Sequence, residues 1–169
     1  QGAQGNTAPT FVGAVTGAIG TNPATGTLSG PKTVNAVAGL ATFSTLSIDK
    51  PGTGYTLTAT GAGVTGTFTS GAFNVTVGVL SQLLFSQPPT NAVAGVAIAP
   101  AMTVVAQDAV GNTVTTFNGN VTLTIGTNPA GGTLSGAATV AAISGIAGCS
   151  GVSIDKASAG YVLTATAGA

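Results

Sequence analysis

The sequence predicts an all-β protein made of tandem β-sandwich repeats, and three observations support this prediction. Apolar residues and threonines alternate with a period of two, as in Val121-Thr122-Leu123-Thr124-Ile125, which is typical of a strand with one buried face. Charged residues make up only 4 % of the chain, while β-branched Thr and Val are abundant; this composition favours sheets over helices. Finally, the chain repeats itself.

The repeat has a period of 106 residues. Residues 1–63 align with residues 107–169 without a gap, with 37 identities in 63 positions. A period of this length matches one β-sandwich domain and not the unit of a short solenoid. We therefore predict two repeats, one at residues 1–78 that lacks its first strands and one at residues 79–169 that lacks its last strand. The shared blocks are GNT, IGTNPA, GTLSG, SIDK and LTAT.

The segment 64–106 occurs only once, so each repeat lacks strands that the other repeat has. The first copy has no counterpart of Leu83–Gln87 and Ala101–Gln107, and the second has none of Thr67–Val77. We expect strands from outside the 169 residues to complete both ends. They would come from adjacent repeats of the same chain or from neighbouring copies by strand addition. The zero net charge makes self-association easier but does not choose between these sources.

Further strands and turns follow from local patterns. Strands are expected at 55–60, 73–77 and 102–106, where apolar and polar residues alternate. The turns Asn22–Gly26 and Asn128–Gly132 combine Asn, Pro and Gly, residues that favour reversal of the chain. Pro88-Pro89 interrupts the strand that begins near Leu83, because proline cannot donate to a sheet.

The side-chain inventory argues against several classes of function. His and Glu are absent and the three Asp are scattered, so we expect no enzyme, no metal and no cofactor. No basic patch is available to neutralise phosphates, so nucleic acid is not an expected partner. The longest apolar stretch, 92–106, is too short for a membrane-spanning helix and contains Gly95 and Pro100.

Three stretches, at 83–100, 104–129 and 39–60, resemble the bacterial immunoglobulin-like repeats strung in tandem in large surface adhesins and fibrous extracellular proteins. The resemblance covers nearly the whole chain. It implies a two-sheet sandwich, an extracellular or cell-surface location and no catalysis. We expect a structural unit of a stalk, fibre or filament. The alternative is an adhesin module that binds glycan or protein ligands through loops such as 126–136; the sequence names no ligand.

Tyr55 and Tyr161 resemble the tyrosine corner of immunoglobulin sandwiches, in which the hydroxyl bonds back to the backbone near the start of a strand. Each follows a glycine and comes shortly before a Leu-Thr-Ala-Thr block. Leu57 and Leu163 stand where antibody domains have a cysteine. Apolar packing is therefore expected in place of the inter-sheet disulfide.

The two copies differ at positions that should be buried. Cys149 replaces Phe43, and the first copy has Gly17 where the second has Leu123. Each of these differences removes core volume, which costs a few kcal/mol where nothing refills the gap. The alternatives are that the two copies are packed differently or that the sequence itself is uncertain at these positions. Cys149 is interpreted as a small core residue, with a reactive thiol as the alternative.

Four polar residues are candidates for local roles. Asp49 and Asp155, in the repeated SIDK block, are expected to bond to nearby backbone; a calcium site would need more oxygen ligands than one carboxylate per copy. Asn74 and Asn120 begin Asn-Val-Thr sequons and should point outward by alternation. They are possible glycosylation sites, with an ordinary polar strand residue as the simpler interpretation.

Overall fold

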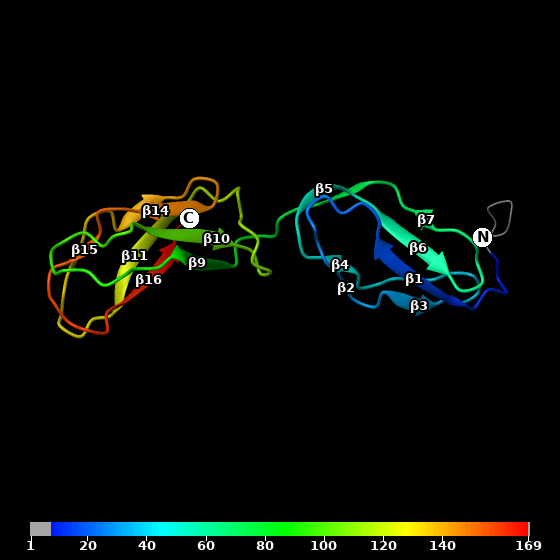
Figure 1. The fold of residues 1–169 in the computed structure, drawn as a ribbon, viewed down its shortest axis with the longest axis horizontal. Helices are drawn as coiled ribbons and strands as arrows, with labels where there is room; N and C mark the ends of the chain where they lie inside the picture. The colour runs from blue at the N-terminus through cyan, green and yellow to red at the C-terminus, as the bar shows by residue number, and fades with distance from the viewer. Residues whose placement is uncertain (1–7, 169) are drawn as a thin grey trace. The chain divides into compact units, whose positions relative to one another are not determined.

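The computed structural model describes residues 8–168 and consists of strands and loops (Figure 1). Over these residues there is no helix, and the strand pairings are antiparallel. The predicted all-β class is therefore confirmed. The chain divides into two compact units, Gln1–Thr76 and Val77–Ala169, called unit 1 and unit 2 below.

Unit 1 contains one four-stranded sheet and two small two-stranded sheets. The larger sheet has the order β3-β1-β6-β7, and the smaller ones pair β2 with β4 and β5 with β8. The strands are β1 (Ala14–Ile19), β2 (Leu28–Ser29), β3 (Thr33–Asn35), β4 (Ser47–Ile48), β5 (Gly52–Tyr55), β6 (Leu57–Gly61), β7 (Phe68–Thr69) and β8 (Phe73–Val75).

Unit 2 contains two three-stranded sheets and one two-stranded sheet. Their orders are β14-β10-β9, β13-β11-β16 and β12-β15. The strands are β9 (Gln82–Gln87), β10 (Met102–Gln107), β11 (Asn120–Thr127), β12 (Leu134–Ser135), β13 (Thr139–Ala141), β14 (Ile146–Cys149), β15 (Ser153–Ile154) and β16 (Val162–Ala167).

Burial along the strands follows the alternation seen in the sequence. In β10, Met102, Val104 and Ala106 are at most 1 % exposed, and the residues between them are partly exposed. In β11, Val121 and Leu123 are buried and the neighbouring threonines face outward. These two strands therefore each present one apolar face to the core, as period-two patterns require.

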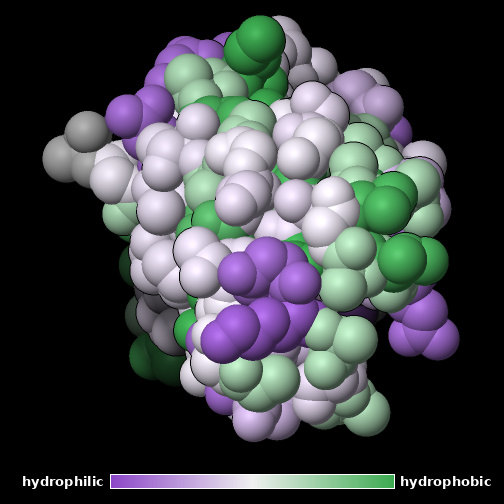
Figure 2. Space-filling model, turned by 90° about the vertical axis from the view of Figure 1, so that its left-hand side faces the viewer, coloured by the Kyte–Doolittle hydropathy of each residue, from purple (hydrophilic) through white to green (hydrophobic). Residues whose placement is uncertain are grey.

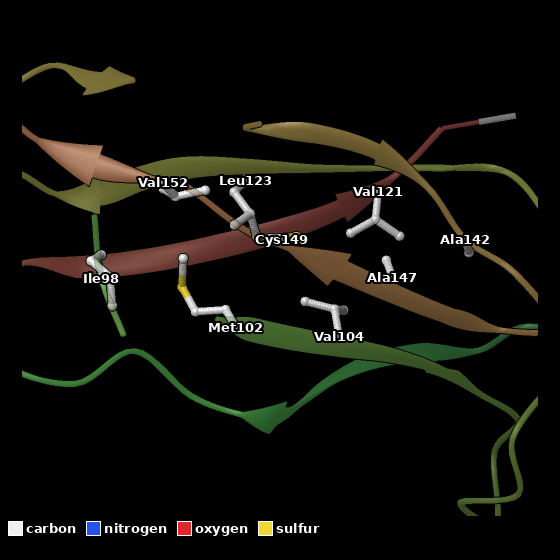
Figure 3. Close-up of a cluster of buried hydrophobic side chains, with 9 residues drawn as sticks. All are labelled: Ile98, Met102, Val104, Val121, Leu123, Ala142, Ala147, Cys149 and Val152. Carbon is white, nitrogen blue, oxygen red and sulfur yellow. The ribbon is translucent and has the colours of Figure 1, made fainter. Parts of the chain in front are cut away.

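The core of unit 2 lies between its two three-stranded sheets. Met102 and Val104 on β10 and Cys149 on β14 face Val121 and Leu123 on β11 (Figure 3). Burying a side chain of this size contributes about 1.5–3 kcal/mol each. The other buried members of the cluster are Ile98, Ala142, Ala147 and Val152.

Unit 1 has a smaller core, and its packing bears on the differences between the two copies. The side chain of Phe43 lies over Gly17: a Cβ placed on Gly17 would be 3.6 Å from Cε1 of Phe43. In unit 2 the counterparts Leu123 and Cys149 belong to one buried cluster. These contacts favour the interpretation that the two copies are packed differently at these positions. In each unit one of the two positions carries a large residue and the other a small one: Phe43 with Gly17 in unit 1, and Leu123 with Cys149 in unit 2. One large side chain is enough to fill the space between the two positions, because protein cores are close-packed.

Candidate functional site

A turn of unit 1 is closed by an asparagine side chain. Asn22 donates from Nδ2 to the Gly26 carbonyl at 2.8 Å and accepts from the Gly26 N–H at Oδ1 at 2.7 Å. An Asn side chain can in this way take the place of backbone in a turn. The next residue, Thr27, donates its N–H to Oδ1 of Asp49 at 2.6 Å. These bonds tie the turn before β2 to the segment after β4.

Tyr55 packs against this turn. It has 0 % of its surface exposed, and its hydroxyl donates to the Lys50 carbonyl at 2.9 Å. A Cβ on Gly26 would lie 2.8 Å from the Tyr55 hydroxyl oxygen, closer than real contacts allow. The turn therefore needs glycine at this position so that the tyrosine can approach the backbone.

Unit 2 makes the same set of bonds. Asn128 holds Gly132 at 2.8 and 2.7 Å, and Thr133 donates its N–H to Asp155 at 2.6 Å. The Tyr161 hydroxyl donates to the Lys156 carbonyl at 3.0 Å, but this tyrosine is partly exposed. We call these residues the turn network: Asn22, Gly26, Asp49 and Tyr55 in unit 1, and Asn128, Gly132, Asp155 and Tyr161 in unit 2.

The turn network holds backbone and offers little chemistry. Asp49 and Asp155 each accept a backbone N–H, as expected for Asp beside a turn. Within residues 8–168, no group of three or more His, Cys, Asp or Glu could hold a metal ion. The network can therefore fix the path of the chain and lacks a cluster of titratable side chains.

Asp108 is a buried carboxylate that the sequence analysis did not single out. It is 3 % exposed. Its Oδ1 accepts from the N–H groups of Val110 and Asn112 at 3.1 and 2.8 Å, and its Oδ2 accepts from the Gly78 N–H and Asn112 Nδ2, both at 3.1 Å. In the sequence, the position of Asp108 just after an apolar strand and before the Gly111-Asn112 turn could have indicated that it bonds to this turn.

These contacts decide the acidity of Asp108. Burial alone would raise its pKa, but hydrogen bonds from Asn112, Gly78 and Val110 stabilise the charged form more strongly. Together they lower the pKa of Asp108 from 3.8 to about 2. The charged side chain thus fastens the start of unit 2, at Gly78, to the turn that follows β10.

The remaining candidate residues lie in ordinary surroundings. Asn74 and Asn120 are both exposed, and Oδ1 of Asn74 accepts from the Gly54 N–H at 3.1 Å. Cys149 is 1 % exposed in the core of unit 2, and burial raises the pKa of its thiol. Burial in the core agrees with the interpretation of Cys149 as a small core residue and not with a reactive thiol.

Unit 2 contains a groove of about 710 Å³. It is lined by residues 89–94 and 156–161, together with Ile98, Ile154 and Leu163. Lys156 is the one charged residue in this lining. Tyr161 therefore contributes both to the turn network and to the groove.

The surface carries few strongly hydrophilic residues. Figure 2 shows a face on which such residues gather in small groups, while most of the surface lies near the middle of the hydropathy scale. Among residues 8–168 no helix is long and apolar enough to cross a membrane. In comparisons with known proteins, no family model matched the chain, and neither the curated proteins nor the solved structures gave a match.

Proposed function

We propose that this protein is a structural extracellular protein, a pair of immunoglobulin-like sandwich repeats from a cell-surface stalk, fibre or filament. The observation that carries the proposal is the turn network, which recurs at a spacing of 106 residues with matching bonds. A turn network that is repeated along the chain suits a structural protein that extends away from a surface or holds other parts at a fixed spacing.

The strand registers support the assignment of the units as two copies. Val15 pairs with Val34 and Gly61 in unit 1, and Val121 pairs with Val140 and Ala167 in unit 2. Each number in the second set exceeds its counterpart by 106. In this proposal the tyrosine bonds to Lys50 and Lys156 are the tyrosine corners of the two sandwiches.

Each unit also has strands that the other does not show among the described residues. Unit 2 has β9 and β10, and unit 1 has β7 and β8. Complementary sets of this kind favour assembly in which strands from adjacent repeats or neighbouring subunits complete each sandwich. The partners are then copies or repeats of the same kind of chain.

The chemistry of the side chains supports a structural role over catalysis. Of the three Asp, each accepts at least one backbone N–H, and Cys149 is buried. We expect no enzymatic activity and no bound cofactor. The alternative is an adhesin that binds glycan or protein ligands through the loop 126–136. Two hydrogen bonds between Asn128 and Gly132 hold this loop in shape.

Immunogold labelling of intact producing cells tests the proposal. Antibodies against residues 1–169 should label extended structures on the outer surface without permeabilisation. Antibodies to a cytoplasmic protein of the same cells serve as the control and should label only permeabilised cells. Labelling of this protein only after permeabilisation would overturn the proposed location and function.

A further inference from the structure

Asn118 and Gly119 form a pair of residues whose chemistry the proposed function does not use. Of the asparagines in the chain, Asn118 is the only one that a glycine follows. In such a pair the backbone nitrogen of the glycine can attack the side-chain amide, because glycine has no Cβ to hinder the approach. The pair lies directly before β11, the central strand of the sheet β13-β11-β16.

The structure leaves both reacting groups accessible. Asn118 is exposed to solvent. Within residues 8–168 no acceptor is present for the Gly119 N–H. The nitrogen that would attack is therefore not held in a hydrogen bond, and water can reach the amide that it would attack.

The amide of Asn118 is also held in place by backbone groups. Its Oδ1 accepts from the Ser144 N–H at 3.0 Å, and its Nδ2 donates to the Thr116 carbonyl at 3.3 Å. The next residue of the turn, Gly145, donates its N–H to the Phe117 carbonyl at 2.8 Å. An N–H group fixed at Oδ1 stabilises the negative charge that this oxygen acquires when the amide carbon is attacked.

Unit 1 shows that the exposure of this position does not arise from the end of the chain. The residues 106 positions earlier are Val12 and Gly13. Unit 1 includes the segment that follows β6, through Thr76, and Val12 is still 68 % exposed. The position therefore lies at the surface in both units, and it accepts a residue other than Asn.

The glycine of the pair, in contrast, is required by packing. A Cβ on Gly119 would lie 2.7 Å from the Gly168 carbonyl oxygen and 2.8 Å from the Phe117 ring, closer than real contacts allow. A Cβ on Gly13 would likewise lie 2.8 Å from the Phe11 ring. The fold thus keeps glycine in both units, and the residue before it decides whether the pair can react.

We propose that Asn118-Gly119 is a self-modification site at which the folded chain converts Asn118 to aspartate or isoaspartate. The Gly119 nitrogen gives its proton to water and bonds to Cγ of Asn118, and Nδ2 takes up a proton and leaves as ammonia. Water then opens the resulting succinimide ring. Breaking the new bond to Cγ yields aspartate, and breaking the original peptide bond yields isoaspartate. Water is the only co-reactant.

The modification changes both the charge and the backbone at the start of β11. Each conversion adds one negative charge to a chain of zero net charge, which opposes self-association. Isoaspartate also lengthens the backbone just before Gly119, whose carbonyl accepts the Ala142 N–H at 2.9 Å. Val121, two residues further on, belongs to the buried core (Figure 3). Conversion to isoaspartate should therefore loosen this end of β11.

Prolonged incubation of the full chain at physiological temperature tests the site. Peptide mapping by mass spectrometry should show modification at Asn118 at least about tenfold faster than at Asn91, which is exposed but followed by alanine. Methylation by an isoaspartyl methyltransferase identifies the isoaspartate. A synthetic peptide of residues 114–122 gives the rate without the fold, and the folded chain should react at least as fast because the Ser144 N–H is in place.

Two variants at position 118 serve as matched controls. Asn118→Val introduces the residue that unit 1 has at this position and should not react. Asn118→Gln keeps the amide on a longer side chain and should react at least about tenfold more slowly. Amide exchange of residues 120–123 should become faster in the aged wild-type chain and stay unchanged in both variants. Circular dichroism checks that the variants fold.

Three outcomes would overturn the inference: equal rates at Asn118 and Asn91, a slower reaction in the folded chain than in the peptide, or conversion to isoaspartate without faster amide exchange in β11. The inference goes beyond the proposed function and does not depend on it. None of these measurements concerns the location of the protein, so the inference and the proposed function can fail separately.

Discussion

Units 1 and 2 carry the same turn network in different surroundings. In unit 1, β8 covers the network and Tyr55 is fully buried. In unit 2, Tyr161 keeps its hydrogen bond while remaining partly exposed beside a groove. The hydrogen-bond lengths differ by only 0.1 Å. Local residues thus set the geometry of the turn, and neighbouring strands set its burial.

The hydrophobic core, in contrast, is larger in unit 2 than in unit 1. Unit 2 has a buried cluster of nine residues around β10 and β11, whereas Leu28, Ala36 and Tyr55 are the hydrophobic residues that are buried in the described part of unit 1. The presence of β9 and β10 explains the difference, because they form with β14 the second layer against β11. A sheet buries an apolar face only where another layer covers it.

The largest expected effect comes from exchanging the core pairs. Leu123→Gly in unit 2 should cost about 4 kcal/mol, from the cavity and the added chain freedom. Cys149→Phe alone should cost about 1–3 kcal/mol by overpacking. The double variant recreates the Gly17–Phe43 pair of unit 1 and should cost less than the sum of the two single changes. Denaturant dependence of amide exchange in unit 2 measures all three.

The coupling between the two positions is the quantity that decides this prediction. A favourable coupling of about 1–3 kcal/mol supports one shared space between the positions. Strictly additive costs would show that Leu123 and Cys149 pack independently. Val104→Ala, elsewhere in the cluster, serves as a control that Cys149→Phe should not rescue.

The second prediction concerns acid. The pKa of Asp108 is lowered to about 2 from 3.8, so its charged form stabilises unit 2 fully above about pH 4. That stability should be lost as the pH falls from 4 towards 2, because the carboxylate binds a proton more readily in the unfolded chain. The residue 106 positions earlier is Gly2, which lies outside the described residues.

Asp108→Asn supplies the control for the acid effect. This variant cannot titrate at position 108, so the stability of its unit 2 should be lower at neutral pH and should change less between pH 4 and pH 2. Amide exchange of residues 78–112, followed across this range, measures both forms. An unchanged pH dependence in Asp108→Asn would contradict the assignment.

A smaller effect should separate the two tyrosines. Tyr55→Phe removes the hydrogen bond that the fully buried Tyr55 donates to the Lys50 carbonyl, and this loss should cost about 1–2 kcal/mol. Tyr161→Phe removes the same bond where water has access, so its cost should be below about 1 kcal/mol. Thermal unfolding of the two variants compares them. Equal losses would indicate that the exposure of Tyr161 has no energetic consequence.

The smallest effect is expected at the outer faces of the sheets. Thr16 bonds to Thr33, and Thr122 bonds to Thr139, each at 2.9 Å between exposed hydroxyls. Thr16→Val and Thr122→Val keep the β-branched shape, so each should change stability by less than about 0.5 kcal/mol. Denaturant unfolding would detect a larger loss in one unit, which would reveal an unequal role for these pairs.

The sequence alone determined the strand class, several strand positions and the turns. Alternation along 121–125 and 102–106 predicted β11 and β10, and Pro88 predicted the end of β9. The repeated Asn-Pro-Ala segments indicated where the chain reverses. These features depend on neighbouring residues, so short-range chemistry is enough to predict them.

Only the tertiary structure decided which residues meet across the core. The sequence suggested lost volume at Gly17 and Cys149, whereas packing showed that Phe43 and Leu123 fill the same kind of space from opposite sides. The groove beside Tyr161 and the bonds to Asp108 likewise join segments far apart in the chain. Contacts of this kind depend on how the sheets pack against each other in space. The pattern of neighbouring residues therefore does not predict them.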